Sequence, residues 1–290
     1  MTKPSLVLRT AAVSAIVLAS AALAPAADCG RDCLRAFLTQ YLDALAAHNP
    51  GALPLASRVR FTEDAKETRL GEGLWKTASK VGTYRQDILD VRQEVAASQA
   101  IVEEAGSPVM LALRLKIADN KISQIETQVT RSRADGALFN IDSLKTPSKA
   151  MNLVPGPARL HSRQEAIKIA SFYPEGLKAG SFLAVDAPFA PDAYRIENGV
   201  ITAGPGCSRA GCENIKTQTI IEHPALVTRV AAVDEELGIV LLWMNFGDTG
   251  SYGPGNSLHV FEAFKVYGGQ IHAVEAFMKV MPASLGSGWD

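Results

Sequence analysis

The sequence predicts an α+β protein made of two copies of one unit, each with an amphipathic helix followed by antiparallel strands. The stretches "LKIADNKISQIET" (115–127) and "FKVYGGQIHAVEA" (264–276) follow the same template, 149 positions apart. A helical stripe of apolar residues and then strand-like patterns precede each stretch. We therefore infer an internal duplication, with about 125 residues in each copy, which is a usual domain size.

In the first copy, apolar residues at helical spacing predict the helix: Leu34, Phe37, Leu38, Tyr41, Leu42 and Leu45. An irregular stretch, "VRFTEDAKE" (59–67), follows it. In the strand "VMLALRLKI" (109–117), every second residue is a large apolar one, so one face of the strand is apolar. The turn "ADNK" (118–121) predicts a hairpin that closes the copy.

The second copy repeats this order. Its helical stripe contains Tyr173 at the place of Tyr41, and we expect Pro174 to kink or distort the helix. Its irregular stretch aligns Glu197 with Glu63. The run "LGIVLLWMNF" (237–246) is almost continuously apolar, which predicts a strand covered on both faces. The turn "YGGQ" then predicts the closing hairpin.

The stretch "KTPSKAMNLVPGPARLHSRQ" separates the copies, and its three prolines and one glycine interrupt regular structure. We place the first domain at 28–148 and the second at 149–290. Residues 1–27 are expected to be a signal peptide, because Lys3 and Arg9 precede a short apolar run and a small-residue site, "APA". A retained anchor is the alternative. We expect a periplasmic or secreted protein with no stable membrane insertion after processing.

Export changes the interpretation of the four cysteines, because oxidising compartments favour disulfides. Cys29 and Cys33 are close in sequence, as are Cys207 and Cys212. Two local disulfides are the simplest of the three pairings that four cysteines allow. A four-cysteine zinc site is the alternative, but its spacing differs from the usual pattern.

The order helix, irregular stretch and antiparallel strands ending in "KI–x–x–I–E" resembles the nuclear transport factor 2-like (NTF2-like or SnoaL-like) superfamily. The resemblance implies two tandem cone-shaped domains, each with N-terminal helices packed on a strongly curved antiparallel sheet. The stretches "PLASRVRFTED", "LGEGLWKTAS" and "MPASLGSGW" look like a bacterial and fungal group of secreted tandem members. The superfamily includes isomerases, dehydratases, epoxide hydrolases, lyases and binding modules, so the resemblance implies a fold rather than one activity.

Composition and motifs exclude several function classes. The formal net charge is −1 and no block of basic residues occurs, so we expect neither nucleic acid nor an anionic membrane as a partner. Nucleotide-binding glycine loops, the serine elbow and the zinc-protease motif are absent from the sequence. The five histidines have no metal-ligand spacing. We therefore expect no metal and no cofactor.

Polar residues on apolar strands suit acid–base chemistry without a cofactor, because burial moves a carboxyl pKa toward neutrality. We predict the working pocket in the second copy, with Glu275 or His259 as general base. Tyr173 is predicted to hydrogen-bond the developing oxyanion. For each of the three, a structural role on the strand or in the core is the alternative.

Five further residues are candidates for substrate binding. His259 and Glu262 fall on opposite faces of "SLHVFEAFKV", so one of them should face the inside of the cone. The others are Trp243 and Asn245 on one face of "LLWMNF", His272 near the last hairpin, and Trp75, which plugs or lines the first cone. Asn245 is either a pocket donor or a residue at the strand end.

We conclude from the sequence that the protein is a cofactor-independent enzyme of lyase or isomerase type. It is expected to act on a small apolar or aromatic molecule by general acid–base catalysis. One alternative is a non-catalytic module that binds a small hydrophobic ligand. The other is a scaffold that forms a homodimer through its open sheet faces.

Overall fold

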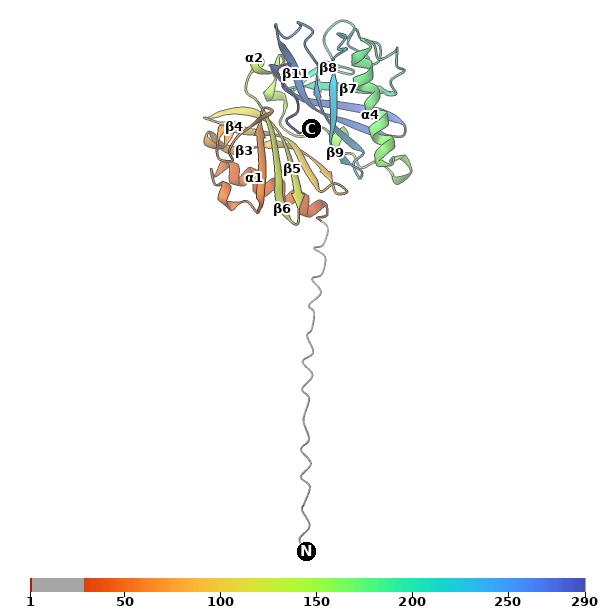
Figure 1. Cartoon of the computed structure of the whole chain (residues 1–290). Coiled ribbons are helices and arrows are strands. Elements are labelled where there is room, and N and C mark those ends of the chain that lie inside the picture. Colours follow the sequence, from red (N-terminus) through yellow and green to blue (C-terminus); the bar gives the residue numbers. More distant parts are fainter. Residues whose placement is uncertain (2–28, 290) are drawn as a thin grey trace.

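In the computed structural model, the described residues are Met1 and 29–289 (Figure 1). Apart from Met1, the predicted signal peptide lies outside the described residues. Within 29–289, no helix has the length and apolar character needed to cross a bilayer.

The first domain is a helix followed by a six-stranded sheet, in the order β2-β1-β6-β5-β4-β3. Neighbouring strands are antiparallel except for β1 and β6, which run parallel. Its elements are α1 (Arg31–Ala46), β1 (Leu55–Glu63), β2 (Lys66–Glu67), β3 (Ala78–Asp90), β4 (Val95–Glu104), β5 (Ser107–Ala118) and β6 (Lys121–Thr130), with short helices η1 (Pro50–Ala52) and η2 (Gly73–Lys76).

The second domain has the same strand order, β8-β7-β12-β11-β10-β9, with β7 and β12 parallel. Its elements are α4 (Arg163–Lys178), β7 (Phe189–Glu197), β8 (Val200–Ala203), β9 (Val227–Asp234), β10 (Ile239–Asn245), β11 (Asn256–Tyr267) and β12 (Gln270–Pro282). The predicted fold class, two tandem cones of α+β structure, is confirmed by this repeated topology.

The connection between the sheets contains short helices: α2 (Arg133–Gly136), η3 (Ile141–Ser143), α3 (Lys149–Asn152) and η4 (Pro157–Arg159). The boundary that we placed at 148/149 falls inside this connection. Lys265 of β11 is buried and donates hydrogen bonds to the backbone carbonyls of Met151, Leu153 and Leu237. This contact ties the connection to the second sheet.

Strand register confirms the internal alignment of the copies. Glu63 pairs with Thr127 in the first sheet, and Glu197 pairs with Ala276 in the second. Thr127 and Ala276 occupy the same template position, so Glu63 and Glu197 are equivalent. Any residue of one cone can therefore be matched with its counterpart in the other.

Each helix packs its apolar stripe into the hollow of its own sheet. The buried residues of α1 include Leu34, Leu38 and Tyr41, and Tyr173 lies buried on α4. The helix α4 continues through Pro174 as one α-helix, so the expected distortion does not break it. Register shifts typical of β-bulges occur in both sheets and help them to curve around the helices.

The outer faces of the two sheets pack against each other in the middle of the molecule (Figure 1). This central core contains Tyr84 and Ile88 from the first domain and Leu241, Trp243 and Phe277 from the second. Every residue of β10 is buried, because α4 covers one face of the second sheet and the first domain covers the other. The prediction of a strand covered on both faces is therefore confirmed.

A buried aspartate at the end of β9 joins the second domain to the first. Asp234 is fully buried, and Arg31 of α1 donates two hydrogen bonds to it, at 2.6 and 3.0 Å. The backbone N–H groups of Leu89 and Leu237 also donate to this carboxylate, at 3.0 Å each. Four donors from both domains thus converge on one acid.

The contact is reciprocal. Asp90, at the end of β3, accepts hydrogen bonds from Arg163 of α4 at 2.8 Å and from the backbone N–H of Val233 at 2.9 Å. The backbone N–H of Gln93 completes this cluster. Each domain therefore inserts one aspartate into the other, and we call this pair of contacts the aspartate clamps.

Candidate functional site

The inside of the second cone holds a buried acid. Glu262 lies on the inward face of β11, between Val260 and Phe264, and is 1% exposed. Neither of its carboxyl oxygens has a hydrogen-bond partner among the described residues. Burial, and then the charge of Glu197, raise the pKa of Glu262 to about 8. At neutral pH this group is therefore mostly a carboxylic acid that can gain and release a proton near working pH.

A tyrosine from the helix faces this acid. The Tyr173 hydroxyl of α4 accepts a hydrogen bond from Arg195 Nη1 at 3.1 Å, which leaves its own proton free to donate. The Tyr173 hydroxyl also interacts with Glu262 and favours the charged form of that carboxyl. Burial raises the pKa of Tyr173 well above its ordinary value, so the hydroxyl keeps its proton. Rings of Phe182 and Phe264 pack around it, with centroids at 5.0 and 4.9 Å.

Arg195 of β7 connects the buried acid to the surface. Its Nε donates to Thr202 Oγ1 at 2.8 Å and forms an ion pair with Glu197 at 3.4 Å. The side chain lines a cavity of about 340 Å³, while its charge also acts on Glu262 and Tyr173 behind it. Arg195 therefore borders the cavity and also acts through its charge on the buried acid, which is not part of the cavity lining.

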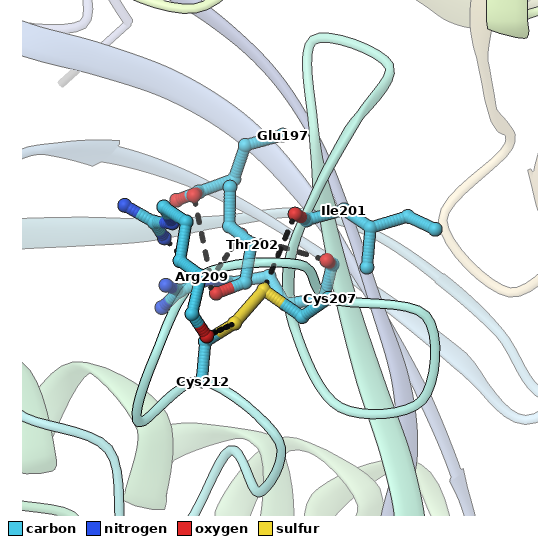
Figure 2. The surroundings of a disulfide bond; sticks show 7 residues. Glu197, Ile201, Thr202, Cys207, Arg209 and Cys212 are labelled. Atoms are coloured by element: carbon cyan, nitrogen blue, oxygen red, sulfur yellow. Dashed lines mark hydrogen bonds and ion pairs between the residues drawn. A yellow bond between two sulfur atoms is a disulfide. The ribbon is translucent and has the colours of Figure 1, made fainter.

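The cavity opens beside the loop between β8 and β9 and has a mixed apolar and polar lining. Its walls include Leu177, Glu197, Arg209, His223, Phe246, Tyr252, Leu258 and Met278. Figure 2 shows the Cys207–Cys212 disulfide gathered with Arg209, Thr202 and Glu197. Arg209 donates from Nη2 to the Thr202 carbonyl at 3.2 Å. The volume is that of a small-molecule site.

The first cone lacks this polar set. By strand register, Leu113 occupies the position of Glu262, and Phe61 occupies the position of Arg195. Tyr41, the counterpart of Tyr173, accepts a hydrogen bond from Trp75 Nε1 at 3.2 Å. The same scaffold is thus filled with apolar side chains in one copy and carries an acid and an arginine in the other. The fold alone does not require this acid and this arginine.

The predicted trio of Glu275, His259 and Tyr173 does not come together, which corrects the sequence-based site. Tyr173 lies inside the cone, whereas Glu275 and His259 lie on the opposite face of the sheet, against the first domain. Glu275 accepts hydrogen bonds from Tyr194 at 2.7 Å and from Tyr84 of the first domain at 3.5 Å. Burial raises the pKa of Glu275, but the acid lies in the domain interface.

His259 is buried in the same interface. Its Nε2 contacts the Pro282 carbonyl at 3.2 Å, and its ring lies edge-on to Trp243 at 5.8 Å. Burial lowers the pKa of His259 to about 4, so the ring is neutral at physiological pH. Trp243 packs in the central core rather than in the cone. Of His259 and Glu262, only Glu262 faces the inside.

The other predicted binding residues also lie elsewhere. Asn245 is at the strand end and donates to the carbonyls of Ala283 and Leu285. His272 stacks on Tyr267 with ring centroids 3.6 Å apart, at the last hairpin. Trp75 plugs the first cone, where its ring meets Tyr41 at 5.3 Å. Among the described residues, no group of three or more His, Cys, Asp and Glu side chains is placed to hold a metal ion.

Both predicted disulfides are confirmed, Cys29–Cys33 and Cys207–Cys212. The second closes the loop that carries Arg209. Replacing Cys207 and Cys212 with alanine should lower the free energy of unfolding by about 2 kcal/mol, the value expected for a short loop. Trypsin should then cut faster after Arg209, which is exposed.

Denaturant unfolding and timed proteolysis of the double variant measure both effects. The matched control replaces Cys29 and Cys33, which close a loop at the first domain and should leave cleavage at Arg209 unchanged. Equal cleavage rates at Arg209 in the two double variants would contradict the role of the disulfide in this loop.

Comparison with known proteins gives a match to one domain family and distant likenesses to solved structures. Residues 159–278 match the model of a family described as "Domain of unknown function (DUF8021)". A search of curated proteins finds no match for this chain.

Two solved structures are similar to part of the chain. One is a de novo designed protein with a curved β-sheet, at 19% identity and a TM-score of 0.30, covering 34% of this chain and 87% of that chain. The other is a putative ketosteroid isomerase from Kribbella flavida DSM 17836, at 13% identity and a TM-score of 0.26, covering 46% of this chain and 93% of that chain.

Sequence reasoning missed Arg195 and ranked Glu262 below Glu275. The signal was present in the duplication, because the two copies differ in charge at these positions. Phe61 and Leu113 in the first copy align with Arg195 and Glu262 in the second. An ionisable residue on the inward face of one copy, where the other copy has an apolar residue, therefore indicates a functional site. An acid that occurs at the same position in both copies is a weaker indication.

Proposed function

We propose that the second cone is a cofactor-independent acid–base active site of lyase or isomerase type. Its substrate is a small apolar or aromatic molecule that carries a carbonyl group. The observation that carries the proposal is the buried Glu262 beside the Tyr173 hydroxyl, which accepts a hydrogen bond from Arg195 and favours the charged form of the Glu262 carboxyl. The apolar first cone supports the same assignment.

Tyr173 and Glu262 do not line the cavity themselves, so in this mechanism the substrate enters beside Arg195, whose side chain moves aside to admit the carbonyl group to Tyr173 and Glu262. The Glu262 carboxylate removes a proton from the carbon next to the carbonyl, and the electron pair moves onto the oxygen. Arg195 and Tyr173 stabilise the enolate that forms. Glu262 then returns the proton to another carbon in an isomerase. In a lyase, the enolate re-forms the carbonyl and a carbon–carbon double bond while the bond to the leaving group on the next carbon breaks, and the proton on Glu262 passes to that leaving group.

We further propose that the protein acts in the periplasm or outside the cell. Two disulfides among the described residues support an oxidising compartment. A homodimer would have to use a surface other than the outer sheet faces, because these faces cover each other within the chain.

Proton exchange tests the chemistry without knowledge of the natural substrate. The protein is incubated in D₂O with a panel of aromatic and alicyclic ketones and β-hydroxy ketones, and NMR follows deuterium incorporation and fragment release. Tyr173→Phe should slow the reaction by about 10²-fold, the usual effect of losing one oxyanion donor. The matched control, Tyr41→Phe, changes the equivalent residue of the first cone and should not affect the rate. Binding without exchange or cleavage would instead support the non-catalytic ligand-binding module.

A further inference from the structure

A groove rich in arginine lies where the outer face of the first sheet meets the second domain. Its volume is about 610 Å³, and it is separate from the cavity of the second cone. Arg58 and Arg60 of β1, Arg114 of β5 and Arg229 of β9 line it, together with Trp289 near the end of the chain. We call it the arginine groove.

Strand geometry brings these side chains together. Arg58 and Arg60 are two residues apart on β1 and therefore share one face. Arg114 pairs with Glu126 across β5 and β6, on the same outer face of the sheet. Arg229 reaches the groove from the second domain, where its Nη2 forms an ion pair with Glu126 at 2.6 Å. Both domains thus contribute to one basic surface.

The groove has more positive than negative charge. Glu126 interacts with two of the arginines, and Glu67 pairs with Arg60 at 3.1 Å. Four guanidinium groups therefore face two carboxylates. Within the part of the chain that the structure describes, Arg58 has no hydrogen-bond or ion-pair partner. The buried Nε of Arg229 has no acceptor either. The guanidinium of Arg58 therefore remains available to a ligand in the groove, whereas the Nε of Arg229 is itself buried.

Trp289 gives the groove a fixed wall. Its indole Nε1 donates to Thr62 Oγ1 at 2.9 Å, and Arg60 stacks on its ring at 4.5 Å. A guanidinium that stacks on an aromatic face keeps its N–H edges free for hydrogen bonds in the plane. The stacking thus orients Arg60 toward a ligand at low entropic cost.

The internal duplication does not account for the arginines of the groove, because two of them align with residues of other types in the second copy. By strand register, Arg60 corresponds to Tyr194, and Arg114 corresponds to Ala263. In the second copy Tyr194 bonds to Ser148 of the connection, at 2.9 Å. The equivalent surface of the second domain is therefore covered by the chain itself, while the arginine groove in the first is open.

We propose that the arginine groove binds a small polyanion through carboxylate or phosphate groups. Planar guanidinium groups bind both oxyanions with paired hydrogen bonds, and charge-assisted bonds are about twice as strong as neutral ones. The volume accommodates a molecule larger than one inorganic phosphate. Because the site contains side chains of both domains, its ligand also strengthens the domain interface.

Calorimetry and thermal unfolding with citrate, inorganic phosphate and pyrophosphate test the proposal on the full chain. Sodium chloride at matched ionic strength is the reference for non-specific screening. Citrate or pyrophosphate should bind and raise the melting temperature above the chloride reference. Arg58→Gln should weaken this binding by about tenfold, the effect of losing one charge-assisted hydrogen bond. It should leave the unliganded stability unchanged, because Arg58 has no partner to lose.

The matched control is Arg133→Gln, which removes an exposed arginine from α2, beyond the far end of β6. Binding of citrate alone identifies a carboxylate ligand, and binding of the phosphates alone identifies a phosphate ligand. Two results overturn the proposal. One is binding that does not exceed the chloride reference. The other is an equal loss in Arg58→Gln and Arg133→Gln, which would show a general charge effect. Glu262→Gln should leave this binding intact, so its outcome is independent of the proposed activity.

Discussion

Replacing Glu262 with glutamine should reduce turnover in the exchange assay by about 10²–10⁴-fold, the usual contribution of a positioned acid or base. The amide keeps the size of the side chain but cannot accept a proton. The wild-type rate should rise with pH up to about 8, where the raised pKa of Glu262 makes the carboxylate the main form. The variant should lack this rise.

The same substitution is also expected to change how the free energy of unfolding depends on pH. Glu262 has a folded pKa above its ordinary value of 4.5, so the folded state holds a proton that the unfolded state releases. Its contribution to stability is complete below pH 4.5 and is lost as pH rises toward 8, by about 1.4 kcal/mol per pH unit. Glu262→Gln should remove this slope, and denaturant unfolding from pH 5 to 8 measures it.

Glu275→Gln is the matched control, because Glu275 is also a buried acid on the second sheet but faces the first domain. It should keep turnover close to the wild-type value. If Glu275→Gln abolishes exchange while Glu262→Gln does not, the active site lies in the domain interface and our assignment is wrong.

Asp234→Ala should lower the free energy of unfolding by about 3 kcal/mol, the cost of breaking a buried charge pair from one side. The change leaves Arg31 and the N–H groups of Leu89 and Leu237 without their acceptor. Because these donors come from both domains, the two domains should also unfold less cooperatively. Denaturant unfolding followed by fluorescence and by circular dichroism would show this as two separate transitions.

The reciprocal variant Asp90→Ala should have a similar effect, since its carboxylate makes the equivalent contacts. The control is Asp186→Ala, which removes an exposed partner of Lys216 and should change stability little. An effect of Asp234→Ala as small as that of Asp186→Ala would show that the aspartate clamps do not hold the domains together.

Much of the fold was predictable because helices and strands leave periodic patterns. The apolar stripes identified α1 and α4, and the template marked the closing hairpins. The continuous apolar run of β10 predicted cover on both faces. What covers the outer face was not predictable, because an apolar pattern indicates burial without naming the partner.

The same ambiguity explains the errors at the site. When both faces of a sheet are buried, alternation cannot tell the inside of the cone from the domain interface. Glu275 and Glu262 are both acids among apolar neighbours, yet they lie on opposite faces. The prediction that one of His259 and Glu262 faces inward was correct, because it used only the alternation along one strand.

The central core between the two sheets has a consequence for how such a molecule responds to dilution. Two separate cones would associate only above their dissociation constant, whereas cones in one chain meet at an effective concentration set by the connection. Their pairing is therefore independent of how much protein is present. Even at low protein concentration, the first cone stays packed against the sheet of the second and stabilises it. Its own interior can then be filled with Leu113, Phe61 and Trp75 and need not keep an open cavity.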